Sequence, residues 1–178
     1  MSKLETNTID TVSGTTNLTI GSTNSSTVTF ESGAATGHMS PAWSAKRDSA
    51  QTGAANTTFV TVVCDVEELD TDNAYNTSTG EFTVPSGKAG KYMIGGSYRT
   101  NASGSATRLN AILTVGGTIT RQTNFNQNSN GEGSSTIHAV LNLSAGDVVA
   151  FKMYQNTGSS VNIDAAGKTY FYGYRIGA

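Results

Sequence analysis

Acidic side chains gather in one run of the sequence, from Asp65 to Asp72. Carboxylate oxygens are ligands that Ca²⁺ prefers, and a calcium loop needs them at fixed positions. Two acids of this run and one that follows it fit the first, third and last ligand positions of such a loop: Asp70, Asp72 and Glu81. The pattern fails at Ala74, where a ligand is needed, and at Tyr75, where a glycine is needed. The run therefore indicates a solvated acidic loop. Asp70 and Asp72 are left as metal candidates, and no other cofactor is expected.

The other residues capable of chemistry form no catalytic pattern. His38 and His138 have no signature that joins them to a nucleophile or a metal. The segment 165–169 is similar to the end of a phosphate-binding loop, but Asn162 replaces the required glycine and a strand follows. Cys64 lies in an apolar run, which is typical of a small buried hydrophobe. We therefore expect a protein that is not an enzyme.

Two long polar segments, 99–108 and 122–131, are better candidates for function. Long loops on a rigid β scaffold commonly carry recognition. Phe125 stands among amides and could stack on a sugar ring, or it could pack within its own subunit or a subunit interface. The candidate receptor-binding residues are Arg99, Asn101, Arg108, Asn124, Phe125, Asn126 and Gln127.

Composition predicts the kind of scaffold that holds these loops. The 178 residues include 20 glycines, only 13% are charged, and Val, Ile, Thr, Tyr and Phe recur in short runs. β-Branched and aromatic residues suit a pleated sheet, so an all-β fold is expected. A net charge of −2 without a basic run argues against nucleic acid. No apolar stretch is long enough for membrane insertion, and the N-terminus lacks the apolar core of a signal peptide. We expect synthesis in the cytoplasm.

The sequence divides into two parts near residue 37. Residues 1–37 show short alternating patches and almost no aromatic residues, which predicts a β-rich arm that needs a partner to be stable. A flexible polar tail is the alternative. The candidate attachment residues of this arm are Leu4, Ile9, Val12, Leu18 and Ile20. Residues 38–178 form the second part, whose predicted strands are 42–47, 57–66, 80–84, 90–99, 107–115, 118–123, 134–143, 147–155 and 168–176.

The last predicted strand is apolar on both faces. Tyr170, Tyr172, Tyr174 and Ile176 share one face, and Phe171 and Gly173 share the other. A sandwich strand needs only one buried face, so the second face is either a further core layer or a subunit interface. Tyrosine suits a half-hydrated interface, and we favour that interpretation.

Four blocks of the second part resemble the C1q domain family. The first block is Pro41-Ala-Trp-Ser-Ala, and the second is Tyr75-Asn-Thr-Ser-Thr-Gly-Glu-Phe-Thr-Val-Pro followed by Gly90-Lys-Tyr-Met. The third and fourth blocks are Leu143-Ser-Ala-Gly-Asp-Val-Val and Phe171-Tyr-Gly-Tyr. Ser86, Gly87 and Lys88 lengthen one loop relative to that pattern. The resemblance implies a C1q/TNF-like jelly roll that forms homotrimers and binds partners without catalysis. It also implies calcium near the apex in some members.

The first thirty-five residues resemble N-terminal segments of tailed-phage fibre and decoration proteins. We therefore expect a virion structural protein of a tailed phage, synthesised in the bacterial host cytoplasm. In this view the arm binds a capsid or tail protein, and the trimeric head displays sites for a host-surface receptor or glycan. The alternatives are a bacterial spore-coat or secreted C1q-like adhesin and a fibre-associated glycan hydrolase, which needs a pair of carboxylates at a groove.

Overall fold

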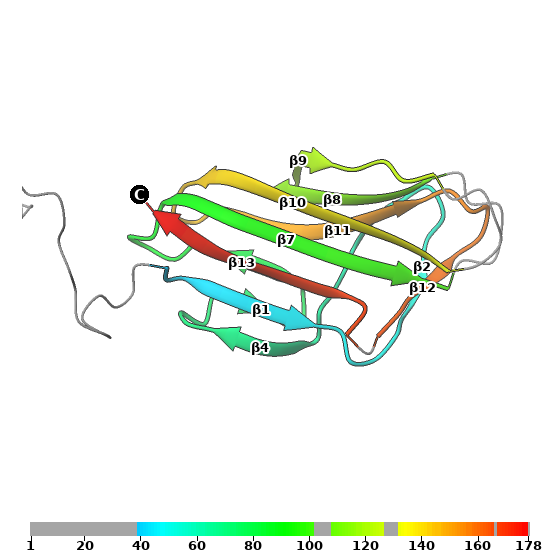
Figure 1. Cartoon of the computed structure of the whole chain (residues 1–178), viewed down its shortest axis with the longest axis horizontal. Helices are drawn as coiled ribbons and strands as arrows, with labels where there is room; N and C mark the ends of the chain where they lie inside the picture. Colours follow the sequence, from blue (N-terminus) through cyan, green and yellow to red (C-terminus); the bar gives the residue numbers. More distant parts are fainter. Residues whose placement is uncertain (1–38, 102–107, 127–131, 166, 178) are drawn as a thin grey trace, which may run out of the picture. The chain divides into compact units, whose positions relative to one another are not determined.

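The computed structural model describes residues 39–101, 108–126, 132–165 and 167–177, which form two β-sheets (Figure 1). The thirteen strands within these ranges are β1 (Ala42–Lys46), β2 (Gln51–Ala54), β3 (Phe59–Thr61), β4 (Val66–Asp70), β5 (Tyr75–Asn76), β6 (Glu81–Thr83), β7 (Gly90–Thr100), β8 (Leu109–Val115), β9 (Thr118–Gln122), β10 (Gly133–Leu143), β11 (Val148–Gln155), β12 (Val161–Ile163) and β13 (Tyr170–Gly177). No helix occurs in the ranges described, and thus none that could span a membrane. The all-β prediction is confirmed.

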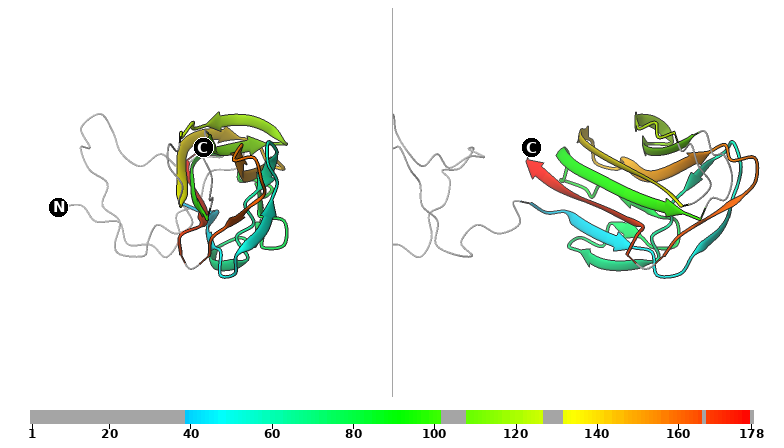
Figure 2. Two further views of the ribbon diagram at one scale, coloured as in Figure 1. Left: turned by 90° about the vertical axis from the view of Figure 1, so that its right-hand side faces the viewer. Right: turned by 45° about the vertical axis from the view of Figure 1, so that its right-hand side comes forward.

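Every strand pairing is antiparallel, and the strands divide into two layers (Figure 2). The first layer, called sheet A here, has the order β2-β12-β7-β13-β1-β4, with β10 paired to β7. The second layer, sheet B, has the order β5-β6-β11-β8-β9, with β3 paired to β11. Neighbouring strands are often far apart in sequence, which is the topology of a jelly roll rather than of a simple meander.

Aromatic side chains fill the core between the sheets. The Trp43 ring of sheet A stacks on Phe82 of sheet B, with 3.7 Å between centroids. Phe171 meets Trp43 edge-on at 5.5 Å and stacks on Phe151 at 5.9 Å. All four side chains are almost completely buried. Burial of such large apolar surfaces is the main stabilising contribution to a sandwich of this size.

Gly173 in β13 makes room for the indole of Trp43. A Cβ built on this glycine would overlap the ring atoms of Trp43. The two residues are cross-strand neighbours, because β1 pairs with β13 at Trp43 and Gly173. Packing therefore explains the glycine in the Phe171-Tyr-Gly-Tyr block. Only glycine lets the indole of Trp43, the largest side chain of the core, lie across the neighbouring strand.

The predicted strand 57–66 is wrong over its second half. Only Phe59–Thr61 forms a strand there, as β3 of sheet B, and the chain then crosses to sheet A, where β4 begins at Val66. Val62 and Cys64 are completely buried in the crossing. Side chains supply the hydrogen bonds that a ladder would give: Gln51 donates to the Thr61 carbonyl and accepts from the Val63 N–H.

The acidic run is also not the loop that the sequence predicted. Residues 66–70 form β4, an edge strand beside β1, and Glu67, Glu68 and Leu69 are exposed on it. Lys46 of β1 pairs with Glu68 at 3.0 Å. Charged residues on an edge strand hinder pairing with the strands of other chains. This explains the acidic residues of β4 without a bound metal ion. The short strands β2, β5 and β12 were likewise not predicted, because two to four residues show no clear alternation.

Candidate functional site

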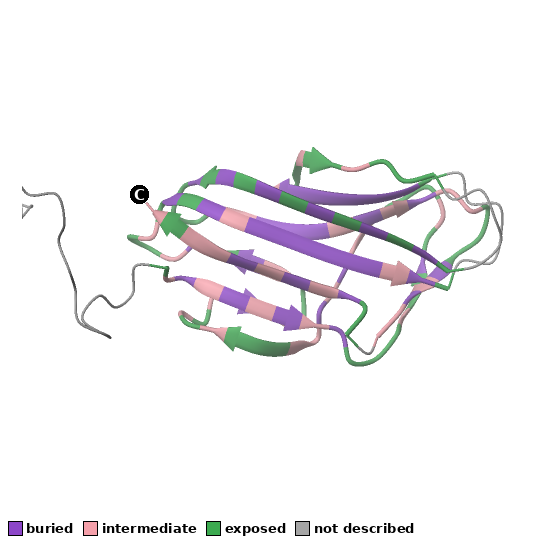
Figure 3. Ribbon diagram, in the orientation of Figure 1, coloured by how far each residue is buried: buried purple, intermediate pink, exposed green. Residues whose placement is uncertain are grey.

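The outward face of sheet A has the chemistry of an interface at its centre. Its centre consists of alternate residues of β10, β7 and β13, which the strand register places side by side. The residues are Thr136, His138 and Val140 of β10, Met93, Gly95 and Ser97 of β7, and Tyr170, Tyr172 and Tyr174 of β13. None of them is a Lys, Arg, Asp or Glu. We call this group the sheet A face. Figure 3 shows the alternation of buried and exposed residues along β10.

Apolar groups on this face remain open to solvent. Val140 is 55% exposed, and Met93 and the three tyrosines are half-buried. The Thr136 hydroxyl donates to the Ser97 hydroxyl at 2.9 Å, so these two polar groups already satisfy one another within the sheet. A surface that is depleted of charge, and that offers Tyr and Met with paired hydroxyls, has the composition of an interface centre.

Gly95 lies at the middle of the sheet A face, between His138 and Tyr172 in the neighbouring strands. An added Cβ at Gly95 would lie 2.5 Å from His138 Nδ1 and 2.7 Å from the Tyr172 hydroxyl oxygen. The two side chains meet over the glycine, with 3.2 Å between the Tyr172 oxygen and His138 Nδ1. Burial, together with the neighbouring Tyr170 and Tyr174, raises the pKa of Tyr172.

The structure brings together three of the four residues predicted for a trimer interface. Tyr170, Tyr172 and Tyr174 point to the sheet A face, and the rings of Tyr170 and Tyr172 are 6.2 Å apart. The register of β13 shifts between Arg175 and Gly177, and Ile176 is 50% exposed at this irregularity. The shared face was therefore predictable from strand alternation. The contact with other subunits stays a prediction.

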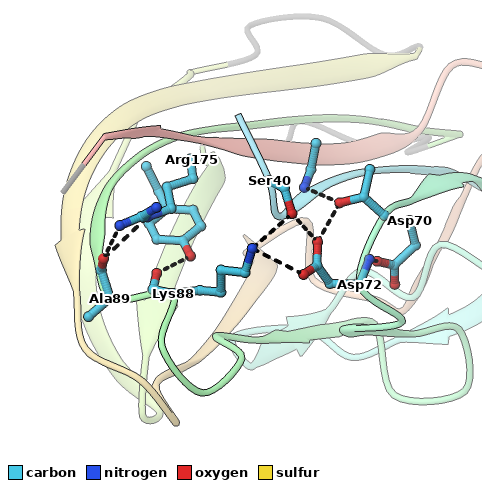
Figure 4. Close-up of polar contacts among 9 residues, drawn as sticks. Ser40, Asp70, Asp72, Lys88, Ala89 and Arg175 are labelled. Carbon is cyan, nitrogen blue, oxygen red and sulfur yellow. Dashed lines mark hydrogen bonds and ion pairs between the residues drawn. The ribbon is translucent and has the colours of Figure 1, made fainter. Parts of the chain in front are cut away.

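The metal candidates Asp70 and Asp72 have internal partners (Figure 4). The two Asp70 oxygens accept the backbone N–H groups of Asp72 and Tyr75, at 3.1 and 2.7 Å. The Asp72 carboxylate accepts from the Ser40 and Thr71 hydroxyls at 2.5 and 2.6 Å. Hydrogen bonds from Ser40 and Thr71, with the charge of Lys88, lower the pKa of Asp72.

These contacts suit a structural clasp better than a calcium site. Lys88 Nζ lies 3.7 Å from Asp72 and 3.3 Å from the Ser40 hydroxyl, where its charge would repel a cation. No group of three or more His, Cys, Asp or Glu side chains could hold a metal within the ranges that the structure describes. The loop lengthened by Ser86, Gly87 and Lys88 thus has a role: it carries the cation of this clasp.

The predicted receptor-binding residues are divided between the two sheets. Arg99 lies in β7 of sheet A, where it pairs with Asp164 at 2.6 Å and with Glu132. Asn101 accepts a hydrogen bond from the backbone of Asn162 at 3.0 Å. These partners indicate that Arg99 and Asn101 hold loops of their own subunit together.

The remaining candidates that the structure describes lie at one end of sheet B: Arg108, Asn124, Phe125 and Asn126. Leu109 and Phe125 form an isolated bridge, which brings the flanking residues Arg108 and Asn124 to the same end of the sheet. Phe125 is 43% exposed, so its ring does not pack in its own core. Asn126 is exposed, and Gln127 lies outside the described residues.

All five attachment candidates of the N-terminal arm, Leu4, Ile9, Val12, Leu18 and Ile20, also lie outside the described residues. Several residues that shape the described surfaces gave no signal in the sequence, namely Gly95, Phe59, Asn110 and Tyr154. Their positions depend on pairings between strands that are distant in the chain. Only the period-two alternation of β10 could have placed His138 on the same face as the tyrosines.

Comparisons with known proteins agree with the topology. A model of the C1q domain matches residues 42–176. The globular domain of zebrafish complement 1qA protein is 18% identical and superposes with a TM-score of 0.56. The match covers 76% of this chain and 97% of the zebrafish chain. The crystal structure of murine APRIL at pH 5.0 is 11% identical, with a TM-score of 0.54. That match covers 75% of this chain and 97% of the APRIL chain. Curated protein sequences yield no significant match. The chain belongs to the C1q domain family.

Proposed function

We propose that this protein is a homotrimeric binding head whose subunits meet through the sheet A face. C1q and TNF-like domains generally form homotrimers and act as binding modules rather than as enzymes. The observation that supports the proposal for this chain is the uncharged centre of sheet A, where Met93, Val140 and the tyrosines are exposed or half-buried. A monomer would leave this surface in water, whereas a trimer removes three copies of it from solvent.

A charge at the centre of the sheet A face tests the proposal. Val140→Lys changes a side chain that is 55% exposed, so the isolated subunit should tolerate it, but an interface would have to bury the ammonium. Light scattering after size exclusion should show a trimer for the unmodified protein and a monomer for the variant. Ile119→Lys is the matched control, because Ile119 is 42% exposed on β9 of sheet B. A monomeric unmodified protein would contradict the proposal.

We further propose that the trimer is a structural protein of a tailed-phage virion, with residues 1–37 as its attachment arm. The resemblance of the arm to phage fibre and decoration segments supports this role, as does the expectation from sequence that a short β-rich arm needs a partner to be stable. Three equal sites on one head multiply avidity for a host surface without new contacts.

The virion role has its own test. Peptides of this chain should appear in mass spectra of purified particles, and gold-labelled antibodies against the head should decorate the capsid or tail. In the full-length chain, Leu18→Asp with Ile20→Asp should abolish incorporation and leave the trimer intact. Particles that lack the chain would refute the virion role without affecting the trimer.

A further inference from the structure

The outward face of sheet B holds a pocket of about 250 Å³ at the end where β8 begins. Its lining comes from β3, β8, β9 and β11 and from the residue before β8: Phe59, Asn110, Gln122, Tyr154 and Arg108. The register explains the assembly, because Tyr154 of β11 stands opposite Phe59 on one side and Asn110 on the other. This pocket lies on the sheet opposite to the proposed trimer interface.

Asn110 is the most informative residue of the pocket. Its side chain is completely buried, and neither the amide nitrogen nor the amide oxygen has a hydrogen-bond partner among the residues that the structure describes. A buried amide that makes no hydrogen bond destabilises the protein that carries it. An apolar residue of similar size would be better for stability alone. The Asn110 amide can therefore donate one hydrogen bond and accept another from a ligand in the pocket.

The other lining residues define the chemistry of that ligand. Phe59 is 50% exposed, and its ring lies 5.4 Å from that of Tyr154, so the pair offers an apolar surface. The Arg108 guanidinium stands over the Tyr154 ring at 5.4 Å. No carboxylate forms an ion pair with Arg108 in the part of the chain that is described. An aromatic surface, two amides and a guanidinium without a described carboxylate partner suit a sugar ring with an acidic group.

We propose that this pocket binds a saccharide unit that carries a carboxylate. The Phe59 ring stacks on the C–H face of the sugar, and the Asn110 and Gln122 amides bond to its hydroxyls. The carboxylate pairs with Arg108, which can offer two parallel donors. Arg108 and Gln122 are exposed and long, and their rotation opens the way to the Asn110 amide. The site is complete on one chain, so it does not depend on trimerisation.

Calorimetric titration of the full-length protein with tetragalacturonate tests the site, with maltotetraose as the neutral comparison. We expect saturable binding of tetragalacturonate and binding of maltotetraose that is weaker by about tenfold or more. Arg108→Gln should weaken tetragalacturonate to the same extent. Arg121→Gln is the matched control, because Arg121 is exposed on β9, does not line the pocket and carries the same charge.

Asn110→Leu separates a binding role from a structural role. It should abolish binding and raise the melting temperature, since it removes an unpaired amide from a buried site. If this variant does not fold, Phe59→Ser replaces it, because Phe59 is half exposed and its loss should leave the fold intact. Undetectable binding at millimolar tetragalacturonate, retained binding in Asn110→Leu or Phe59→Ser, or equal binding of maltotetraose would each overturn the proposal. Light scattering on the same samples reports the oligomeric state independently.

Discussion

Tyr172 and His138 join two strands of sheet A that are not neighbours, by a hydrogen bond of 3.2 Å that passes over Gly95 of the strand between them. Their rings are 6.3 Å apart and tilted by 51°. Both side chains come from outer positions of their strands, so the pair belongs to the sheet A face and not to the core. Gly95 is the residue that permits this contact, since any side chain there would occupy the same space.

Gly95→Ala should therefore weaken the trimer. The added methyl would displace His138 and Tyr172, which are ends of side chains that can move, so the subunit should still fold. We expect the trimer dissociation constant to rise by at least about tenfold, because a repacked interface centre loses complementarity. Sedimentation equilibrium measures this constant. Gly177→Ala is the control, since an added Cβ there meets nothing within 4 Å. Equal dissociation constants for the two variants would contradict the proposed interface.

Gly173→Ala should destabilise the subunit itself. Its methyl would overlap the Trp43 ring in the middle of the core, and overpacking of this kind costs about 1–3 kcal/mol or more. In a Trp43→Phe background the smaller ring leaves more space, so the same substitution should cost less. Urea denaturation of the two single variants and the double variant gives the coupling free energy. If the losses in unfolding free energy of the two single variants simply add in the double variant, contact with Trp43 is not the reason for glycine at position 173.

Asp72→Asn should lower stability at neutral pH and not in acid. The folded-state pKa of Asp72 lies below its ordinary value of 3.8, so the carboxylate stabilises the fold above that pH. This contribution is lost as the pH falls through the lowered folded-state pKa. A partly exposed carboxylate with two hydroxyl donors and one ammonium should contribute about 1 kcal/mol. Denaturation curves at neutral pH and in acid measure the free energy of unfolding that the substitution removes at each pH. Asp48→Asn is the control, because Asp48 is exposed. A loss that does not depend on pH would argue against the charge as its cause.

Cys64 should be inert in the folded protein. The thiol is completely buried in the crossing between β3 and β4, and this burial raises its pKa to about 12. The thiolate is the reactive form, so a disulfide reagent should label Cys64 only as fast as the subunit opens. The labelling rate should therefore increase in Gly173→Ala and remain unchanged in Ile119→Lys. Labelling at the rate of a free cysteine would contradict the buried crossing.

Period-two alternation made much of sheet A predictable. The long strands β7, β10 and β13 were expected within a few residues of their ends, and the three tyrosines were expected on one face. These features depend only on residues near one another in sequence, since side chains of a strand alternate wherever it lies. The family-like blocks then supplied the topology that alternation cannot give.

The departures from prediction occur where distant segments meet. An apolar run such as 57–66 does not reveal that it leaves one sheet for the other, because Gln51 supplies the missing backbone hydrogen bonds from a separate strand. The acidic run was expected to be a solvated loop, with Asp70 and Asp72 as metal candidates, because Lys88, the partner of Asp72, lies elsewhere in the sequence. The pocket at Asn110 likewise needs the register of β8 and β11, which no local pattern encodes.

Gly95 and Gly96 are neighbours in β7, yet their substitution should fail in two different ways. Gly96 faces the core, where an added Cβ would lie 2.9 Å from the Phe151 ring, whereas Gly95 faces the opposite side. In a library of variants screened for soluble yield and then for assembly, changes at Gly96 should be lost in the first screen. Changes at Gly95 should pass it and be lost in the second. Adjacent codons would then report separately on folding and on assembly.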